Sequence, residues 1–273
     1  MIESCLGSYR TRLTRCRFIF MKGHFRAKKC KNNDMQAEII LSPLLYPGRE
    51  LREAEITVAV DVLRATSAIC AAFFAGAERI VPLASLAPLE EYHKAGYLIA
   101  AERNGKKLGL ATCGNSPTEY LRQDLRGARL AYSTTNGTVS ITTAGDAKCL
   151  YVGAFANITT LAEATKDAES ILILCSGWKG EPSLEDTLFA GALLDKIAQY
   201  GREIETVNDA ATAAGDLWAT ARGDVYKYCE KATHVRRLKR LGAEADIQWS
   251  FEQDTTPGIL PRYNKEHKWL EIK

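Results

Sequence analysis

The segment SILILCSGWKGEPSLEDTLFAGALLDKIAQYG, residues 170–201, contains the pattern that decides the fold. Its first part, 170–174, is a short apolar run, which predicts a strand that is buried on both faces. Its later part, 184–200, follows a Pro-Ser pair and ends before Gly201, which predicts a helix. A buried strand that leads into a helix is the repeating element of α/β proteins.

The same alternation extends over most of the chain. Further buried strands are predicted at 37–41, 56–60, 79–83, 97–100, 129–133 and 149–152. Further helices are predicted at 65–75, 86–95, 117–124, 138–144 and 157–166. This order predicts an α/β fold of three layers (α/β/α), with helices on both faces of a largely parallel or mixed sheet. Residues 206–241 are expected to be mainly helical. The tail from 244 onward is expected to be mixed, with irregular structure at Pro257-Gly258 and Pro261.

The net charge of +3 is unevenly distributed along the chain. Residues 1–34 hold nine Lys or Arg and two acidic residues, whereas the remaining residues hold 27 and 31. The mildly acidic main part does not favour nucleic acid as a partner. We interpret residues 1–34 as a basic N-terminal extension, either disordered or the product of an over-long translation start with Met35 as the true initiator. The alternative is a targeting segment or a nucleic-acid-binding arm. Residues 35–273 are expected to form one domain.

Hydropathy and cysteine content indicate the cellular environment. No apolar stretch is long enough to cross a membrane, so no membrane partner is expected. The chain has eight cysteines and no CxxC pair. This predicts reduced, buried thiols in a cytoplasmic protein rather than a zinc ribbon. The sequence leaves a homo-oligomer open.

Polar, glycine-rich segments recur where ligands bind in open α/β sheets, after the strands. Five are present: DVLRATS (61–67), ERNG (102–105), GNSP (114–117), TTNGT (134–138) and CSGWKGEPSLED (175–186). Together they predict a site for a small phosphorylated anion. The chain has no GxxxxGK[ST], GxGxxG or GxSxG motif, so a P-loop, a dinucleotide fold and a nucleophile elbow are not indicated.

The first segment combines a carboxylate, a guanidinium and two hydroxyls at a predicted helix start. Asp61 is a candidate ligand for Mg²⁺, which prefers hard oxygen donors. Arg64 is a candidate for bidentate phosphate binding, and Thr66 and Ser67 are candidates for substrate binding at the helix N-terminus. The alternative is local: Thr66 or Ser67 caps the helix, and Asp61 pairs with Arg64.

Two further loops are candidates for substrate binding. A backbone cradle for an anion is predicted from Thr134, Thr135, Asn136, Gly137 and Thr138. The alternative is a β-turn at Asn136-Gly137 before a capped helix. Asn115 and Ser116 are weaker candidates, because Ser116 as N-cap before Pro117 explains that segment locally.

The last segment carries two neighbouring acids, Glu185 and Asp186, which with Asp61 are the candidate metal ligands. The alternative is that Ser183 and Asp186 form a capping box and the acids complement the helix dipole. Cys175 and Gly177 are further candidates for substrate binding. His234 lies in THVRRLKR (233–240), which we interpret as a solvated basic helix; the alternative is that His234 reaches the site.

In this order, the five segments resemble the 2-phosphosulfolactate phosphatase family of coenzyme M biosynthesis, over roughly residues 37–241. The resemblance implies a Mg²⁺-dependent acid phosphatase with a three-layer α/β/α fold, which hydrolyses 2-phospho-3-sulfolactate to 3-sulfolactate. The sequence departs from the family pattern at Ala101, Trp178, Lys179 and Val235. The departures lie near the expected site and therefore bear on the substrate.

We accordingly expect a phosphomonoester hydrolase that acts on a small phosphorylated, sulfonated substrate. Asp61, Arg64, Glu102 and Arg103 are the candidate catalytic residues, and the two arginines would bind the phosphate and the second anion. The nucleophile is expected to be a water activated by Mg²⁺. An aspartyl-phosphate on Asp61 is the alternative mechanism. The alternative functions are a phosphatase for another phosphorylated hydroxy acid and a non-catalytic anion-binding protein.

The first prediction concerns the basic extension. Deleting residues 1–34 should leave folding and activity intact, because this segment has no hydrophobic period able to bury a face. Thermal unfolding and phosphate release of the truncated and full chains test this. A large drop in melting temperature on truncation would contradict it.

Overall fold

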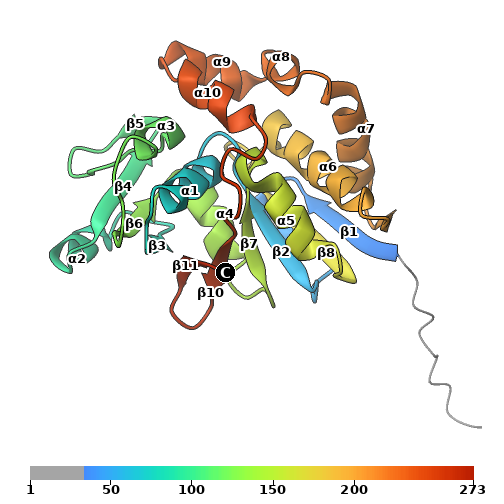
Figure 1. Ribbon diagram of the computed structural model, residues 1–273, viewed down its shortest axis with the longest axis horizontal. Helices are drawn as coiled ribbons and strands as arrows, with labels where there is room; N and C mark the ends of the chain where they lie inside the picture. Colours follow the sequence, from blue (N-terminus) through green and yellow to red (C-terminus); the bar gives the residue numbers. More distant parts are fainter. Residues whose placement is uncertain (1–33) are drawn as a thin grey trace, which may run out of the picture. The chain divides into compact units, whose positions relative to one another are not determined.

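Residues 34–273, which the computed structural model describes, contain one mixed sheet of eleven strands (Figure 1). Its order is β5-β4-β6-β3-β11-β10-β7-β2-β8-β1-β9. All seven predicted strands are present: β1 (Asp34–Ile40), β2 (Ile56–Val60), β3 (Arg79–Pro82), β4 (Leu98–Arg103), β6 (Arg129–Ser133), β7 (Leu150–Gly153) and β8 (Ser170–Cys175). They form two parallel groups, β4-β6-β3 and β7-β2-β8-β1, as the alternation predicts. The predicted extension lies outside the described residues, apart from Asp34 at the start of β1.

The six predicted helices are also present, some of them shorter than predicted. They are α1 (Ala65–Phe74), α2 (Leu89–Lys94), α3 (Pro117–Tyr120), α4 (Gly137–Thr143), α5 (Ile158–Thr165) and α6 (Leu184–Ala198). The region expected to be mainly helical contains α7 (Asp209–Ala221), α8 (Val225–Cys229) and α9 (Thr233–Arg240). Just before it, β9 (Glu203–Thr206) extends the sheet beside β1; this strand was not predicted.

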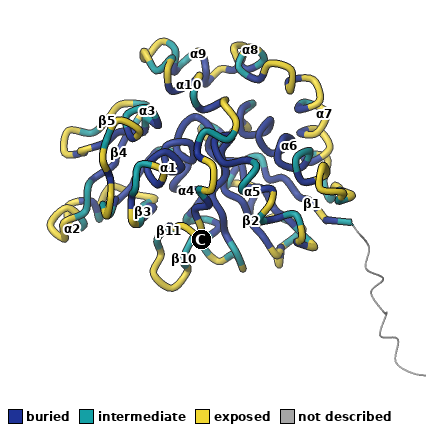
Figure 2. The backbone as a smooth tube through the Cα atoms, in the orientation of Figure 1, coloured by how far each residue is buried: buried dark blue, intermediate teal, exposed yellow. Residues whose placement is uncertain are grey.

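Strand β8 shows why the sheet carries helices on both faces. Its alternate residues Ile171 and Ile173 pack into a core with α5, α6 and α7. Leu172 and Leu174 pack into a second core with α1 and α4 on the opposite face. Successive side chains of a strand point to opposite faces of the sheet, so an uninterrupted apolar strand must be packed against helices on both faces. The three-layer α/β/α prediction is confirmed, and Figure 2 shows the central strands buried between the helices.

The C-terminal tail is more regular than predicted. It forms α10 (Glu244–Phe251) and an antiparallel hairpin, β10 (Pro261–Asn264) and β11 (Trp269–Ile272). The hairpin lies between the two parallel groups, where Arg262 pairs with Tyr151 of β7 and Leu270 with Ile80 of β3. The prediction of irregular structure at Pro261 was wrong, because proline is tolerated as the first residue of a strand.

Helices α8, α9 and α10 lie together at one end of the sheet (Figure 1). They share the core of α6 and α7, into which Cys229, Val235 and Ile247 pack. This places the helical region over the carboxyl ends of the central strands, where the predicted loops also lie.

Two further expectations concern membranes and cysteines. Between residues 34 and 273, no helix has the length and apolarity needed to cross a membrane. The five cysteines in this range are free thiols, and Cys70, Cys113, Cys175 and Cys229 are buried, as expected.

Helices α6 and α7 are in contact at a glycine. A Cβ atom on Gly191 of α6 would lie 2.1 Å from the backbone oxygen of Ala214 in α7 and 2.9 Å from the Cβ of Trp218. Gly191→Ala should therefore destabilise the protein by about 1–3 kcal/mol, because the helices must separate. The free energy of unfolding, measured by urea denaturation, tests this.

Gly215, in the middle of α7, provides the matched control. A Cβ atom there would meet nothing within 4 Å. Gly215→Ala should stabilise the fold by about 0.5–1 kcal/mol, because alanine loses less conformational entropy in a helix. Equal effects of the two substitutions would contradict the close packing of α6 on α7.

Candidate active site

A small polar pocket lies beyond the carboxyl end of β2. Each of the five predicted segments contributes at least one residue to its wall, and α9 contributes three. The lining residues are Asp61, Leu63, Arg64, Glu102, Gly105, Asn115, Thr134, Thr135, Asn136, Trp178, His234, Arg237 and Leu238. The structure therefore brings together residues from distant loops: Asp61 and Trp178, which both line the pocket, lie 117 positions apart in the sequence.

Asp61 follows β2 directly and is buried between two helix starts. The N–H of Ala65 in α1 donates to its Oδ1 at 3.4 Å. On the other side, a Cβ atom on Gly137 of α4 would lie 2.8 Å from Oδ2, so only glycine allows this approach. Burial, with the charges of Asp186 and Glu102, raises the pKa of Asp61 well above its usual value. The ionised carboxylate is therefore costly without a cation beside it.

The hydroxyls of Thr66 and Ser67 do not line the pocket, although both residues were predicted to bind substrate. The Oγ1 of Thr66 donates to the carbonyl of Asp61 at 2.9 Å, and the Oγ of Ser67 donates to the carbonyl of Val62 at 2.8 Å. Both side chains are fully buried. They shape the turn between β2 and α1. Neither caps α1, whose N-cap position is Arg64 without a side-chain cap.

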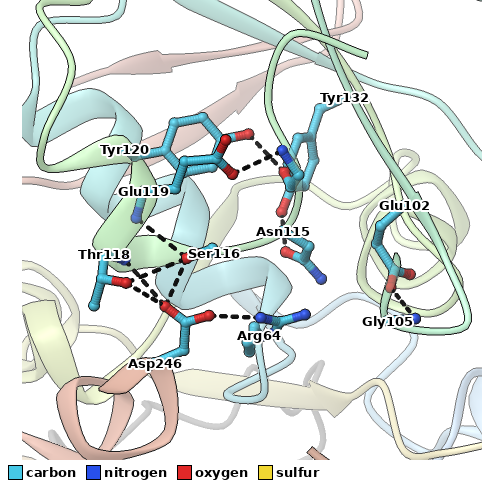
Figure 3. A network of polar contacts seen from close by, with 11 residues as sticks. Arg64, Glu102, Gly105, Asn115, Ser116, Thr118, Glu119, Tyr120, Tyr132 and Asp246 are labelled. Atoms are coloured by element: carbon cyan, nitrogen blue, oxygen red, sulfur yellow. Dashed lines mark hydrogen bonds and ion pairs between the residues drawn. The ribbon is translucent and has the colours of Figure 1, made fainter. Parts of the chain in front are cut away.

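Arg64 pairs with a residue that sequence reasoning missed. Its Nη1 donates to Oδ2 of Asp246 at 2.5 Å, and both side chains are buried (Figure 3). The alternative pairing with Asp61 is therefore wrong. The Oδ1 of Asp246 accepts from the hydroxyls of Ser116 at 2.7 Å and Thr118 at 2.6 Å. One carboxylate of α10 thus joins the starts of α1 and α3.

Ser116 caps the N-terminus of α3, which was the alternative to substrate binding. Its Oγ accepts from the N–H of Glu119 at 3.1 Å, with Pro117 as the first helical residue. It does not line the pocket, whereas its neighbour Asn115 does. The Oδ1 of Asn115 accepts from the hydroxyl of Tyr132, which directs the amide (Figure 3).

Glu102 connects two of the predicted loops. Its Oε2 accepts from the N–H of Gly105 at 2.6 Å. Its Oε1 accepts from the N–H and hydroxyl of Thr135, at 3.2 and 2.8 Å. Its carboxylate is thus bonded by three donors of the protein and orders the pocket wall.

The loop 134–138 is closed by its own side chains. The N–H of Thr134 donates to Oγ1 of Thr138 at 3.2 Å, and the N–H of Thr138 donates to Oγ1 of Thr134 at 3.3 Å. Thr134, Thr135 and Asn136 line the pocket, whereas Thr138 is fully buried behind them. The loop thus brings polar residues to the pocket, but the N–H groups of Thr134, Thr135 and Thr138 are bonded within the protein and Gly137 is not a lining residue, so the backbone cradle stays a prediction.

Arg103 has a different place from the one predicted. Its Nη1 donates to the carbonyls of Glu102 at 2.7 Å and Ser133 at 3.1 Å, and its Nη2 donates to Oγ of Ser133 at 2.9 Å. Its guanidinium therefore joins the ends of β4 and β6 and does not line the pocket.

Asp186 joins the segments that follow β2 and β8. Its Oδ1 accepts from the N–H of Val62 at 2.8 Å, and its Oδ2 accepts from the N–H of Gly177 at 3.1 Å. Ser183 precedes α6 without a side-chain cap, so the capping-box alternative is wrong. Burial raises the pKa of Asp186 to about 6.

Glu185 and Cys175 lie outside the pocket. Glu185 lines a neighbouring cavity, which shares Trp178 and His234 with the pocket. Its Oε2 is buried and has no hydrogen-bond partner among the described residues, and burial together with the charge of Asp186 raises the pKa of Glu185 to about 8. Cys175 is fully buried at the end of β8, where burial raises the pKa of its thiol.

The fit of a divalent cation differs among the three predicted ligands. Asp61 lines the pocket together with Thr134, Thr135 and Asn136, which are residue types with a side-chain oxygen. Mg²⁺ commonly uses one or two carboxylates and retains waters, so this set fits the ion. Both oxygens of Asp186 already accept backbone N–H groups, and Glu185 faces the neighbouring cavity. Within residues 34–273, no three His, Cys, Asp or Glu side chains are arranged as a metal-binding group.

Helix α9 was interpreted as solvated, but it forms one wall of the pocket. His234, Arg237 and Leu238 lie at helical spacing i, i+3 and i+4, which places them on one face. The ring of His234 contacts Trp178 edge-on at 4.7 Å. Burial, with the charges of Arg237 and Arg64, lowers the pKa of His234 to about 4, so it is neutral at neutral pH. The spacing of His234, Arg237 and Leu238 could have indicated a pocket-facing side of α9, but the many basic residues of this segment favoured a solvated helix.

The Arg64–Asp246 pair generates the next prediction. Asp246→Asn should lower stability by about 3–5 kcal/mol, because it leaves the Arg64 cation buried without its counter-ion. It should also raise the KM for a phosphorylated substrate, because Arg64 loses the contact that positions it. Urea denaturation and steady-state kinetics measure both effects.

Asp254→Asn is the control for losing a carboxylate that binds a threonine. Asp254 accepts from the N–H and the hydroxyl of Thr159 at 2.9 and 2.6 Å, as Asp246 does from Thr118. Among residues 34–273, Asp254 has no arginine partner and pairs only loosely with Lys196, at 3.9 Å. This variant should keep the wild-type KM. Equal KM values for wild type and Asp246→Asn would contradict a role of the ion pair in positioning Arg64.

Comparison with known proteins agrees with this geometry. The model of the 2-phosphosulpholactate phosphatase family matches residues 41–266. A protein of Prochlorococcus marinus, named probable 2-phosphosulfolactate phosphatase, is 38% identical over 70% of this chain and 82% of its own length. A protein of Gloeobacter violaceus with the same name is 35% identical over 84% of this chain and 95% of its own length. The chain therefore belongs to the 2-phosphosulpholactate phosphatase family.

Proposed function

We propose that the protein hydrolyses 2-phospho-3-sulfolactate to 3-sulfolactate and phosphate, with Mg²⁺ as cofactor. Membership of the family supports a phosphatase, and the relatives' names give this substrate for those proteins. The observation that carries the proposal is the pocket, where the buried carboxylate of Asp61 and the guanidinium of Arg64 adjoin the polar loop 134–136. This combination suits a phosphate group together with a cation.

The residues of the pocket have distinct roles in this proposal. Arg64, held by Asp246, binds the phosphoryl oxygens, and the hydroxyl of Thr134 and the amide of Asn136 bind them from the opposite loop, where the hydroxyl of Thr135 already donates to Glu102. Leu63 and Leu238 are buried in the wall and limit access of water. Asp61 would hold Mg²⁺, which when bound neutralises negative charge on the transferring phosphoryl group.

Two alternatives are tested by the same assay. A phosphatase for another phosphorylated hydroxy acid would release phosphate faster from a substrate that lacks the sulfonate. A non-catalytic anion-binding protein would release none above background. A cytoplasmic location is part of the proposal, since the five cysteines between residues 34 and 273 are free.

The decisive experiment measures phosphate release from 2-phospho-3-sulfolactate as a function of Mg²⁺ concentration. We expect turnover by the wild type that requires Mg²⁺. Asp61→Asn should reduce kcat by at least about 100-fold, because the developing charge loses its main electrostatic support. Asparagine retains an acceptor oxygen for the N–H of Ala65, so the fold should persist.

A thermal shift separates the metal from catalysis. Mg²⁺ should raise the melting temperature of the wild type, because it stabilises the ionised form of a buried acid, and it should not raise that of Asp61→Asn. Glu185→Gln is the control, since Glu185 lies outside the pocket. A Mg²⁺ response lost in Glu185→Gln but kept in Asp61→Asn would place the ion in the neighbouring cavity instead.

A further inference from the structure

Three arginines lie in or beside the pocket, and two of them have protein partners. Arg64 pairs with Asp246, and Arg103 binds the backbone at the ends of β4 and β6. Arg237 differs from both. In the part of the chain that the structure describes, no carboxylate lies within ion-pair distance of its guanidinium, although the group lines the pocket.

Two surfaces hold the guanidinium of Arg237 in place. Its Cζ lies 4.5 Å from the ring centre of Trp178. On another side is the turn at Gly105, where an added Cβ would lie 3.4 and 3.5 Å from the Nη atoms of Arg237. The side chain is only partly exposed. An arginine that stacks on an aromatic ring uses its face, which leaves the N–H groups at its edge to bind an anion.

The positions of the charged groups in the pocket indicate what the guanidinium of Arg237 can bind. Arg64 and the loop 134–136 provide donors for one anionic group, and Arg237 provides a second, separate set of donors in the same pocket. His234 also contacts Trp178, and burial with the charges of Arg237 and Arg64 lowers its pKa to about 4, so it is neutral and does not supply a further charge. A substrate with two acid groups can therefore use both arginines, whereas a simple phosphoester can use only one.

We propose that Arg237, stacked on Trp178, binds the substrate's second acid group and thereby makes the enzyme selective for phosphoesters that carry a carboxylate or sulfonate. This inference rests on the proposed function for the phosphate, and it assigns to α9 a role in specificity. Trp178 is the platform that fixes the guanidinium.

The test compares three phosphoesters with wild type and Arg237→Gln. They are 2-phospho-3-sulfolactate, 2-phospholactate, which lacks the sulfonate, and isopropyl phosphate, which lacks both acid groups. We expect Arg237→Gln to lower kcat/KM for phosphosulfolactate by roughly 10- to 100-fold, the effect of losing one charge-assisted hydrogen-bonded contact. The rate for isopropyl phosphate should change less than about twofold. If kcat/KM also falls for 2-phospholactate, Arg237 binds the carboxylate. If kcat/KM falls only for 2-phospho-3-sulfolactate, Arg237 binds the sulfonate.

Arg236→Gln is the matched control, because Arg236 is the exposed neighbour on α9 and carries the same charge. It should leave all three rates unchanged. Trp178→Leu should lower kcat/KM for the same phosphoesters as Arg237→Gln does, but by a smaller factor, since the guanidinium remains but is no longer held by the ring. An equal loss for all three phosphoesters in Arg237→Gln, or no loss for any, would overturn the proposal.

A binding measurement keeps this test independent of catalysis. Isothermal titration with 3-sulfolactate, which has no phosphate, reports on the second-acid site alone. Its Kd should rise roughly 10- to 100-fold in Arg237→Gln and stay unchanged in Arg236→Gln. Equal Kd values for wild type and Arg237→Gln would overturn the inference. If the wild type binds 3-sulfolactate but hydrolyses none of the phosphoesters, the proposed function fails while the role of Arg237 stands.

Discussion

A guanidinium and a carboxylate buried together at the carboxyl end of β2 connect distant parts of this chain. Arg64 is the N-cap residue of α1, and Asp246 lies 182 positions later in α10. A buried charge without its partner costs several kcal/mol, so each of these side chains requires the other. Because Asp246 also accepts hydrogen bonds from Ser116 and Thr118, the same pair sets the position of α3. Helices α3 and α10 are thus attached to the loop that follows β2 and lines the pocket.

The pocket gathers acids as well as arginines, and its chemistry depends on their balance. Burial raises the pKa of both Asp61 and Asp186, and the charge of Asp186 raises the pKa of Asp61 further. Asp186 is compensated by two backbone N–H groups from different loops. Asp61 accepts less from the protein and lines the pocket, so it is the acid that gains most from a bound cation. An anionic substrate and a cation would therefore support each other's binding in one small volume.

Most predicted site residues occupy one of two shells around this pocket. Asp61, Arg64 and Thr135 reach its surface. Ser67 and Thr138 lie behind it and bind the backbone of the loops. A short hydroxyl side chain at a strand end can either line a pocket or bond to the loop backbone. The direction that the turn gives to the side chain decides between the two. Selectivity for the substrate then depends on α9 as well, where Arg237 stacks on Trp178 of the loop after β8.

The sequence by itself determined the layers, the seven main strands and the loops that meet at one edge of the sheet. This was possible because buried apolar runs and their alternation with helices are local patterns, as in β8 and α6. Only the tertiary structure decided the partner of Arg64, the place of the C-terminal hairpin inside the sheet and the approach of α9 to the pocket. The partners in these contacts lie far apart in the chain, and short strands and a basic helix carry weak local signals. Their positions depend on buried charge pairing and packing, which only the folded chain brings into effect.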